Sequence, residues 1–309
     1  MDRYQLRRLV HEAGALLARA GVASPDVDAR VLAEHVMGRS LVMVDGASPE
    51  QVERYRALVE RRAAREPLQL LTGIMWFRGL ELQARPGVFI VRPETEVVAG
   101  AAIDAALAVT RGVDGVAREV AGAQSAAGAG RASGRPSGRS PVVIDLCTGS
   151  GAIAISVASE VPGADVTAVE RDPAAARLAR DNAERLAPGR VRVVQGDATA
   201  PATLAELDGT VDVVVSNPPY VPADALEDPE TERFDPPLAL FGGGEAGLTV
   251  PRAVIARAAS LLRPGGILVM EHDAGQGEAL RQAAEAAGLH EVSTGRDLAG
   301  RDRFLRAVR

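Results

Sequence analysis

The chain has few of the residues that build disulfide bonds, metal sites and aromatic clusters. Of its 309 residues one is cysteine and four are histidine, and aromatic residues make up 3%. A single cysteine excludes an intrachain disulfide, and the histidines lack the spacing of metal ligands. No signal-peptide pattern and no run of about 18 apolar residues is present. We therefore expect a cytoplasmic protein without a metal and without membrane contact.

An excess of positive charge is also missing. The chain has 41 acidic and 35 basic residues, which gives a net charge of −6. Proteins that bind nucleic acids depend on lysine and arginine to neutralise phosphates. The composition therefore disfavours stable nucleic-acid binding, although a local basic patch is compatible with an acidic total. Apolar residues reach 47%, which is enough for a sizeable core.

The N-terminal part has the pattern of a helical domain. Apolar residues recur at helical spacing through residues 1–66. Ser24, followed by proline, indicates a helix start, and Gly38 indicates a helix end. Ser48 and Gln51 have the spacing of a capping box that opens a further helix.

The next segment, residues 74–90, alternates as a β-hairpin does, with a turn at Arg78 and Gly79. A helix is expected near residues 94–109. The predicted organisation is a helical N-terminal domain at 1–73, a hairpin linker at 74–93 and a larger domain at 94–309.

The larger domain has the pattern of an α/β fold. Residues 111–141 are rich in Gly, Ala, Ser and Arg without periodicity, which predicts a flexible insertion. Beyond it, apolar runs alternate with helical segments, which is typical of a mostly parallel, Rossmann-like sheet with helices on both faces. The predicted strands lie near residues 142–146, 165–170, 191–195, 211–216, 266–271, 289–294 and 302–308.

The most informative motif is Asn217-Pro218-Pro219-Tyr220, directly after a buried apolar run. Two prolines stop the strand and fix the backbone at the carboxyl end of a sheet, where open α/β sheets bind ligands. The amide oxygen and a nearby backbone carbonyl can accept both hydrogens of a planar NH2 group, and the ring can pack against that group. These four residues are candidate substrate-binding residues. The competing interpretation is a strand-ending turn that needs only proline.

A glycine-containing loop follows an earlier strand of the same domain. Glycines at a strand-to-helix turn supply unusual dihedral angles and let the backbone approach a ligand closely. The candidate cofactor-binding residues of this loop are Asp145, Cys147, Thr148, Gly149, Ser150 and Gly151.

Acidic residues end the two strands that follow. Glu170 lies about 20 residues beyond the loop, the place from which an acid can accept hydrogen bonds from ribose hydroxyls. Asp197, followed by Ala198, can accept from an adenine amine. With Asp145 and Asn217, polar residues end four successive strands, and we assign all of them to cofactor binding. The alternative is that they are ordinary strand caps.

The loop lacks the features of a phosphate site. It has no Gly-Lys-Ser/Thr, and its acid would repel the phosphates of a dinucleotide. An acidic loop suits a cationic ligand better. S-adenosylmethionine carries a sulfonium and an ammonium group and no phosphate, so the sequence predicts a class I S-adenosylmethionine-dependent methyltransferase fold rather than a dehydrogenase.

Together these residues resemble the protein-(glutamine-N5) methyltransferases, the HemK-type enzymes that modify peptide chain release factors. The resemblance covers the chain except near residues 111–140. Its most specific parts are Arg92-Pro93-Glu94-Thr95-Glu96 and Asp297-Leu298-Ala299-Gly300-Arg301-Asp302-Arg303, and Glu271 and Gln276 also match. Cys147 stands where the family has a glycine, which we interpret as a position that does not demand glycine.

The resemblance implies methyl transfer from S-adenosylmethionine to the side-chain amide nitrogen of glutamine in a Gly-Gly-Gln loop of release factors. It also implies a monomer whose helical domain docks the substrate. For this reaction we expect Asn217 Oδ1 and the Pro218 carbonyl to accept the two amide hydrogens, with Tyr220 packed against the amide or near the sulfonium. We identify no strong general base.

Two other functions stay open at this point. Asn-Pro-Pro-Tyr also occurs in enzymes that methylate the amino groups of DNA, adenine N6 or cytosine N4. Such an enzyme would need a base-flipping pocket and a basic recognition domain. The other possibility is a non-catalytic S-adenosylmethionine-binding protein, which we would expect to have lost one of the four strand-end groups.

Overall fold

The computed structural model describes residues 1–112, 138–223, 225 and 229–309, and within them the chain forms two compact units. The predicted insertion at 111–141 lies, for residues 113–137, outside the described residues. The first unit consists of Met1–Met75, Gln83–Ile90 and Leu226–Asp235, and the second of Trp76–Leu82, Val91–Ala225 and Pro236–Arg309. No helix of the described residues combines the length and apolar character needed to cross a membrane.

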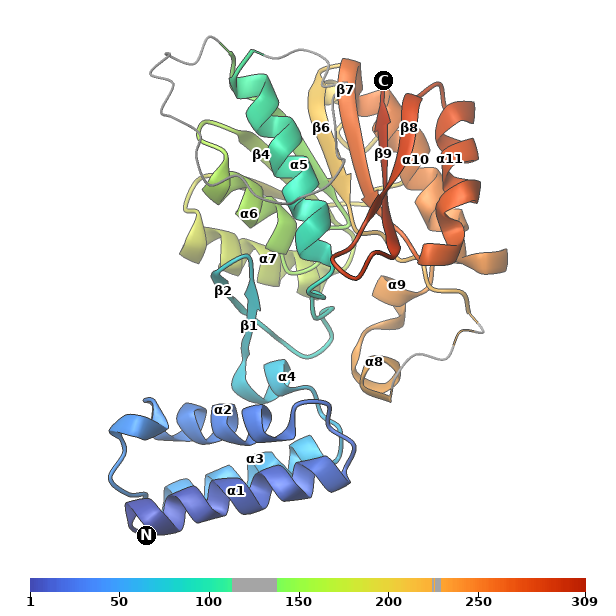
Figure 1. Cartoon of the computed structure of the whole chain (residues 1–309). Coiled ribbons are helices and arrows are strands. Elements are labelled where there is room, and N and C mark those ends of the chain that lie inside the picture. The colour runs from blue at the N-terminus through green and yellow to red at the C-terminus, as the bar shows by residue number, and fades with distance from the viewer. Residues whose placement is uncertain (113–137, 224, 226–228) are drawn as a thin grey trace. The chain divides into compact units, whose positions relative to one another are not determined.

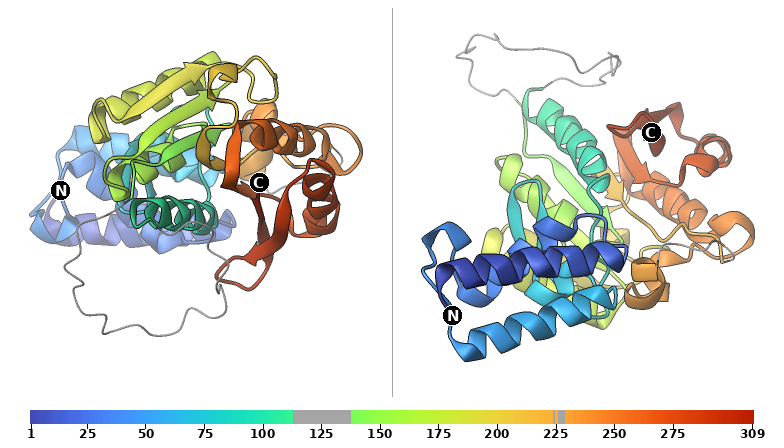
Figure 2. Two further views of the ribbon diagram at one scale, coloured as in Figure 1. Left: turned by 90° about the horizontal axis from the view of Figure 1, so that it is seen from above. Right: turned by 60° about the horizontal axis from the view of Figure 1, so that its bottom comes forward.

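The first unit is helical, as the sequence predicts. Its elements are α1 (Arg3–Arg19), α2 (Pro25–Met37), η1 (Leu41–Met43), α3 (Pro49–Ala63), α4 (Leu68–Thr72) and α8 (Pro229–Phe234). Helix α1 packs against both α2 and α3, and the right-hand view of Figure 2 shows α1 lying along α3. Leu6, Leu17, Leu32 and Tyr55 are buried at the centre of this unit.

The helix ends of this unit follow the predicted signals with one exception. Ser48 and Gln51 form the predicted capping box at α3. Gly38 ends α2 in the left-handed conformation that favours glycine, with a φ of 68°. Ser24 is the residue before α2, but its side chain makes no capping hydrogen bond. Proline at the first helical position is the signal that starts this helix.

A buried ion cluster joins three helices of the first unit. Arg62 Nε donates to Asp28 Oδ2 at 2.8 Å, and Arg62 Nη1 donates to Glu230 Oε1 at 2.9 Å. Arg65 Nη2 lies 2.9 Å from the same Glu230 oxygen. Asp28 and Arg62 are only 7% and 5% exposed. The cluster therefore ties α8 to α2 and α3 through a buried Asp28–Arg62 pair and a partly exposed Glu230.

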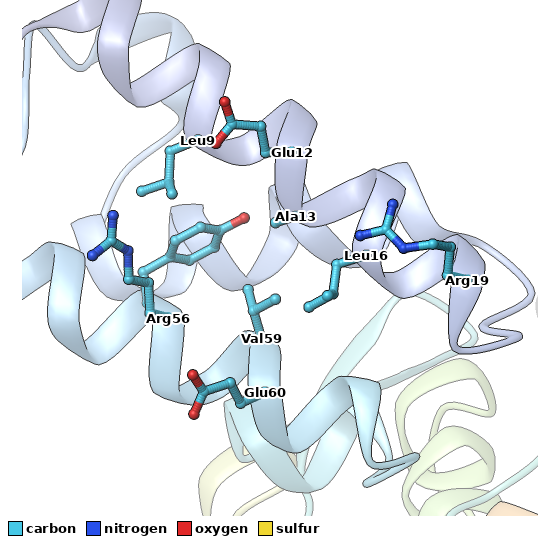
Figure 3. Close-up of a pocket in the computed structure, with 9 residues that line it drawn as sticks. Leu9, Glu12, Ala13, Leu16, Arg19, Arg56, Val59 and Glu60 are labelled. Atoms are coloured by element: carbon cyan, nitrogen blue, oxygen red, sulfur yellow. The ribbon is translucent and has the colours of Figure 1, made fainter.

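A cavity of about 200 Å³ lies on the first unit between α1 and α3 (Figure 3). Its apolar wall comes from Leu9, Ala13, Leu16 and Val59, beside the buried ring of Tyr55. Charged residues, Glu12, Arg19, Arg56 and Glu60, also line it.

A short hairpin connects the helical segment to the second unit. It consists of β1 (Ile74–Phe77) and β2 (Leu80–Gln83), with the predicted turn at Arg78 and Gly79. Both turn residues have positive φ, 47° and 76°, as the turns preferred in two-residue hairpins require. The strands are shorter than the alternation over residues 74–90 predicts.

The second unit is an α/β fold around a seven-stranded sheet (Figure 1). Its strands are β3 (Val142–Leu146), β4 (Asp165–Glu170), β5 (Val191–Gln195), β6 (Val211–Ser216), β7 (Leu262–Glu271), β8 (His290–Arg296) and β9 (Asp302–Val308). The spatial order is β5-β4-β3-β6-β7-β9-β8. Strands β3 to β7 are parallel, whereas β9 runs antiparallel between β7 and β8. The predicted strands and the mostly parallel sheet are confirmed.

Helices cover both faces of this sheet. Contacts of α5 with α6 and of α6 with α7 place three helices in one layer, and α10 and α11 form the other. The helices of this unit are α5 (Thr95–Thr110), α6 (Ala152–Glu160), α7 (Pro173–Leu186), η2 (Ala205–Leu207), α9 (Pro237–Leu240), η3 (Glu245–Gly247), α10 (Thr249–Leu261), η4 (Ala274–Gln276) and α11 (Gly277–Ala286). A continuous apolar core packs against the sheet, with Ile144, Leu146, Val214, Leu261 and Leu268 fully buried.

Strand β7 begins four residues before the predicted start at residue 266. The Pro264-Gly265-Gly266 sequence reads locally as a turn, but Leu262 pairs with Val211 ahead of an irregularity in the ladder. Tertiary pairing therefore extends the strand beyond what the local sequence predicts.

Candidate active site

The four strand-end residues of the sequence prediction lie along one edge of the sheet. Strands β5, β4, β3 and β6 are adjacent and parallel, so Asp145, Glu170, Asp197 and Asn217 are all at their carboxyl ends. Strand β4, which follows β3 in the chain, pairs with one side of β3, and β6 pairs with the other side. This change of direction creates the crevice in which doubly wound sheets bind ligands.

The loop between β3 and α6 has an unusual backbone. Gly149 and Gly151 have φ values of 57° and 87°, and a Cβ added at Gly149 would meet nothing within 4 Å. Thr148 N donates to Val169 O at 3.0 Å, which attaches the loop to the end of β4. Ser150 is buried, and its carbonyl accepts from Asn182 at 3.1 Å. The loop thus combines firm anchoring with open space above Gly149.

The backbone at Cys147 qualifies the interpretation that this position does not demand glycine. Its φ is 63°, in the left-handed region that favours glycine. The position tolerates cysteine, but at a backbone cost that glycine would not have. Glycine adopts this φ without a steric cost, which explains why the loops that this one resembles have glycine at the position. The pKa of the thiol is raised by burial and by the neighbouring acids, which keeps it neutral.

Asp145 is a buried acid with an unused acceptor. The residue is 0% exposed, and its Oδ2 accepts from Thr148 Oγ1 at 2.5 Å and from Ala154 N at 3.1 Å. Its Oδ1 has no hydrogen-bond partner among the described residues. Burial raises its pKa to about 7. A cationic N–H donor would satisfy Oδ1 and stabilise the charged form.

Glu170 is held in place by the backbone. Its Oε2 accepts from Gly149 N and its Oε1 from Asp172 N, both at 2.8 Å. Burial raises its pKa, and these backbone hydrogen bonds act in the opposite direction. Each carboxylate oxygen keeps further acceptor capacity, so the fixed group can receive two hydroxyl donors.

Asp197 mainly organises its own turn. Its Oδ1 accepts from Thr199 N at 2.9 Å and from Thr199 Oγ1 at 2.6 Å, and these hydrogen bonds lower its pKa. The next residue, Ala198, is buried. The turn therefore presents a charged carboxylate near the end of β5.

The Asn-Pro-Pro-Tyr segment begins where β6 ends. Ser216 Oγ donates to Leu146 O at 2.7 Å, which fixes the start of the segment against β3. Asn217 Nδ2 donates to Thr95 Oγ1 at 3.2 Å, and Tyr220 OH donates to Glu271 Oε1 at 3.1 Å. The two polar groups of the motif are therefore both held by side chains from other elements.

Three residues that contact this segment received no role in the sequence prediction. Thr95 begins α5, Glu271 ends β7 and Gln276 ends η4. Gln276 Nε2 donates to Tyr220 O and to Ala246 O, both at 2.8 Å. Glu271 could have been found, because it ends a strand as the other candidate acids do. Thr95 and Gln276 contact the segment from distant positions in the sequence, and local patterns do not reveal such contacts.

The motif Asp297 to Arg303 shapes the turn between β8 and β9. Asp297 Oδ1 accepts from the backbone N–H groups of Ala299 and Arg301, at 2.9 and 3.0 Å. Its Oδ2 accepts from Arg303 Nη2 at 3.1 Å. Burial raises the pKa of Glu271 to about 7, and the charge of Arg303 acts against this rise. The motif thus places a cation beside the carboxylate that holds Tyr220.

Two family models match this chain. Residues 139–296 match the family model described as a methyltransferase domain, and residues 8–73 match the model of the PrmC N-terminal domain. The second unit is therefore a methyltransferase domain. In the part of the chain that the structure describes, no group of three or more His, Cys, Asp or Glu residues could hold a metal ion.

Curated relatives cover nearly the whole chain. The chain is 43% identical to the release factor glutamine methyltransferase of Bifidobacterium longum, over 97% of this chain and 98% of the relative. It is 41% identical to the Mycolicibacterium smegmatis protein of that name, over 99% and 98% of the two chains. The Streptomyces coelicolor protein of that name is 43% identical, with 96% of each chain covered. The chain belongs to the release factor glutamine methyltransferase family, and the resemblance seen in the sequence is confirmed.

Proposed function

We propose that this protein methylates the side-chain amide nitrogen N5 of glutamine in the Gly-Gly-Gln loop of peptide chain release factors. The observation that carries the proposal is the full-length match to relatives named release factor glutamine methyltransferase. The site geometry supports it, because Asn217 and Tyr220 are held at the carboxyl end of β6, beside the glycine loop.

The proposed cofactor is S-adenosylmethionine, which when bound supplies an electrophilic methyl group on a sulfonium. Asp145 fits its ammonium group, because the buried Oδ1 lacks a hydrogen-bond partner among the described residues. Glu170 would accept from the ribose hydroxyls, and Asp197 from the adenine amine. Cys147, Thr148, Gly149, Ser150 and Gly151 would line the cofactor side of the crevice, with Ala198 beside the adenine.

The residues of this chain would act mainly by orienting the nucleophile. A carboxamide nitrogen is weak because its lone pair is delocalised into the carbonyl. Asn217 Oδ1 and the Pro218 carbonyl would accept the two amide hydrogens, which holds the nitrogen in line and stabilises positive charge as it develops. Pro219 fixes the backbone between them and Tyr220, whose ring would pack against the amide.

The helical unit would hold the release factor. Its described residues include no comparable set of strand-end acids, and it presents large apolar side chains to solvent: Tyr4, Val42 and Met43 are 82%, 70% and 71% exposed. Apolar groups of this kind on one small unit suit contact with a protein partner. We also propose that the enzyme acts as a monomer in the cytoplasm and forms no stable complex with nucleic acid.

The decisive experiment offers the enzyme two substrates. Purified protein is incubated with methyl-labelled S-adenosylmethionine and either a release factor or duplex DNA. We expect label on the release factor at the Gly-Gly-Gln glutamine, and none when that glutamine is replaced by alanine. Label on DNA alone would support methylation of adenine N6 or cytosine N4 and would overturn the proposal.

A further inference from the structure

The backbone of the Asn-Pro-Pro-Tyr segment depends on anchors at its two ends. Pro218 and Pro219 have no backbone N–H, so donors of the chain itself cannot fix the centre of the segment. The first end is held where Ser216 Oγ donates to β3. We propose that Gln276 is a positioning residue that holds the other end, at Tyr220, and thereby sets the direction of the Pro218 carbonyl. The inference rests on the proposed methylation of an amide and adds one residue to its machinery.

Gln276 uses every polar atom of its side chain in this position. Its Nε2 donates to Tyr220 O and to Ala246 O, both at 2.8 Å, and the residue is only 5% exposed. Its Oε1 accepts from Asp273 N at 3.1 Å. A backbone N–H can only donate and a carbonyl oxygen can only accept, so a single orientation of the amide satisfies all three partners. Two donors and one acceptor in this order are what a glutamine side chain supplies.

The connection that carries Gln276 holds Tyr220 at two points. Gln276 forms a capping box with Asp273 at the start of η4, so its side chain is fixed by its own turn. The same connection, residues 271–276, begins at Glu271, whose Oε1 accepts from Tyr220 OH at 3.1 Å. The ring of Tyr220 is therefore held through its hydroxyl and its backbone through its carbonyl.

A tight turn at residues 242–247 packs against the same stretch of backbone. A Cβ added at Gly247 would lie 2.2 Å from Tyr220 O, which shows how closely the turn approaches the segment. Ala246 has a φ of 58°, a conformation that is costly for a residue with a Cβ. Its carbonyl is the second acceptor of Gln276. One buried amide thus joins the strained turn to the end of the Asn-Pro-Pro-Tyr segment.

The direction of the Pro218 carbonyl depends on this anchor. A residue before proline prefers a ψ of about +120° to +160°, and this range still lets its carbonyl turn by about 40°. Pro219 has its φ fixed by its ring, so holding Tyr220 O restricts most of the freedom that remains. A carbonyl that is aimed at the substrate amide beforehand stabilises the developing positive charge without reorganisation. Loss of the anchor should therefore slow the reaction more than it weakens substrate binding.

The first test removes the amide and keeps the length of the side chain. Gln276→Met lacks both donors, and Gln282→Met is the matched control, because the Gln282 amide bonds Glu278 on the surface of α11. Single-turnover methylation of a release factor at saturating cofactor should be about 10²-fold slower in Gln276→Met, the effect of misplacing a reacting group by about 1 Å. Gln282→Met should keep the wild-type rate.

Two binding measurements separate positioning from a loss of structure. The affinity for S-adenosylmethionine, measured by calorimetry, and the KM for the release factor should stay close to wild type in Gln276→Met. A wild-type rate in Gln276→Met, or equal losses of rate in Gln276→Met and Gln282→Met, would overturn the inference.

A second variant keeps the test decisive if Gln276→Met does not fold. Gln276→Glu preserves the volume and the acceptor for Asp273 N, but it supplies at most one donor where glutamine supplies two. One of the two carbonyls then loses its partner, and the single-turnover rate should fall at least about tenfold. An unchanged rate in Gln276→Glu would equally overturn the inference.

A third measurement does not depend on methyl transfer. The chain has three tyrosines, so protein labelled with 3-fluorotyrosine can be followed by fluorine NMR, and Tyr220→Phe identifies the signal of Tyr220. In Gln276→Met and Gln276→Glu this signal should shift or broaden, whereas the signals of Tyr4 and Tyr55, in the helical unit, should stay unchanged. An unchanged Tyr220 signal in both variants would contradict the inference. If the signal changes as expected but the wild-type enzyme labels no release factor, only the proposed function is refuted.

Discussion

Each unit contains a deeply buried aspartate, and the two aspartates differ in what surrounds them. In the helical unit, the buried Asp28 is paired with Arg62, which also binds Glu230. In the methyltransferase domain, the buried Asp145 makes no ion pair with any described residue, and its pKa is raised to about 7. Asp28 is thus satisfied within the helical unit. The methyltransferase domain also pairs a buried acid, Asp212 with Arg263, but it leaves Oδ1 of Asp145 without a partner among the described residues.

We expect this difference to separate residues that stabilise the fold from residues that serve the proposed reaction. A buried ion pair that loses one partner leaves an uncompensated charge, so it affects stability strongly. A strained or unsatisfied group is tolerated when it contributes to binding, and such groups concentrate at functional sites. Substitutions in the first set should change unfolding, and substitutions in the second should change binding or rate.

The largest effect on stability is expected for Arg62→Met. The change leaves Asp28 buried without its cation and should lower the free energy of unfolding by about 3–5 kcal/mol. Urea denaturation measures it. Arg61→Met is the matched control, because the neighbouring Arg61 pairs with Glu66 at the surface and should cost less than about 1 kcal/mol. Similar losses in the two variants would remove the distinction between the paired core charge and a surface charge.

Asn217→Ala should reduce the rate of methyl transfer about 10²–10³-fold, the usual effect of removing one preorganised transition-state partner. Release-factor affinity should persist, because the helical unit is unchanged. Asn217→Asp keeps an acceptor oxygen and should retain some activity. Single-turnover assays with saturating cofactor and release factor measure both variants. A wild-type rate in Asn217→Ala would make Asn217 a turn residue without a role in the reaction.

Glu170→Ala should weaken S-adenosylmethionine binding at least tenfold, since hydrogen bonds to a charged group contribute about 1.5–3 kcal/mol. Isothermal titration calorimetry gives the affinity. Glu184→Ala, an exposed acid on α7, is the control for loss of one negative charge. Equal affinities in Glu170→Ala and Glu184→Ala would contradict the assignment of Glu170 to the ribose.

The smallest effect is expected at Cys147. Glycine would relieve the positive φ but lose more backbone entropy on folding, so Cys147→Gly should change stability by less than about 1 kcal/mol. Cys147→Ala keeps the Cβ in the left-handed region and should be less stable than Cys147→Gly. Thermal unfolding of the two variants measures the difference. A more stable Cys147→Ala would show that backbone strain at this position is negligible.

The sequence predicted the sheet well because its signals are local. Apolar runs bounded by glycine, proline and polar residues locate the strands of the methyltransferase domain, and the strand-end rule locates Asp145, Glu170 and Asn217. The turn at Arg78 and Gly79 is equally local. These features depend on neighbours within a few residues along the chain.

The remaining features depend on contacts between distant segments. Asn217 and Thr95 are 122 positions apart, and Tyr220 and Glu271 are 51 apart. No periodicity relates such pairs. The same holds for α8, which follows β6 in the chain but belongs to the helical unit through Arg62. The conformation of Cys147 was missed for another reason, because the residue type gives no sign of positive φ.

The turn at Gly247, beside Tyr220, limits the transfer of the Asn-Pro-Pro-Tyr motif to other proteins. A Cβ added at Gly247 would lie 2.2 Å from the Tyr220 carbonyl oxygen, and Gln276 bonds that same oxygen. Grafting the tetrapeptide onto another doubly wound scaffold would transfer the amide and the ring without the parts that hold their backbone. A working graft would need a glycine turn, a glutamine donor and the Thr95 and Glu271 contacts as well, so the transferable unit is a whole sheet edge.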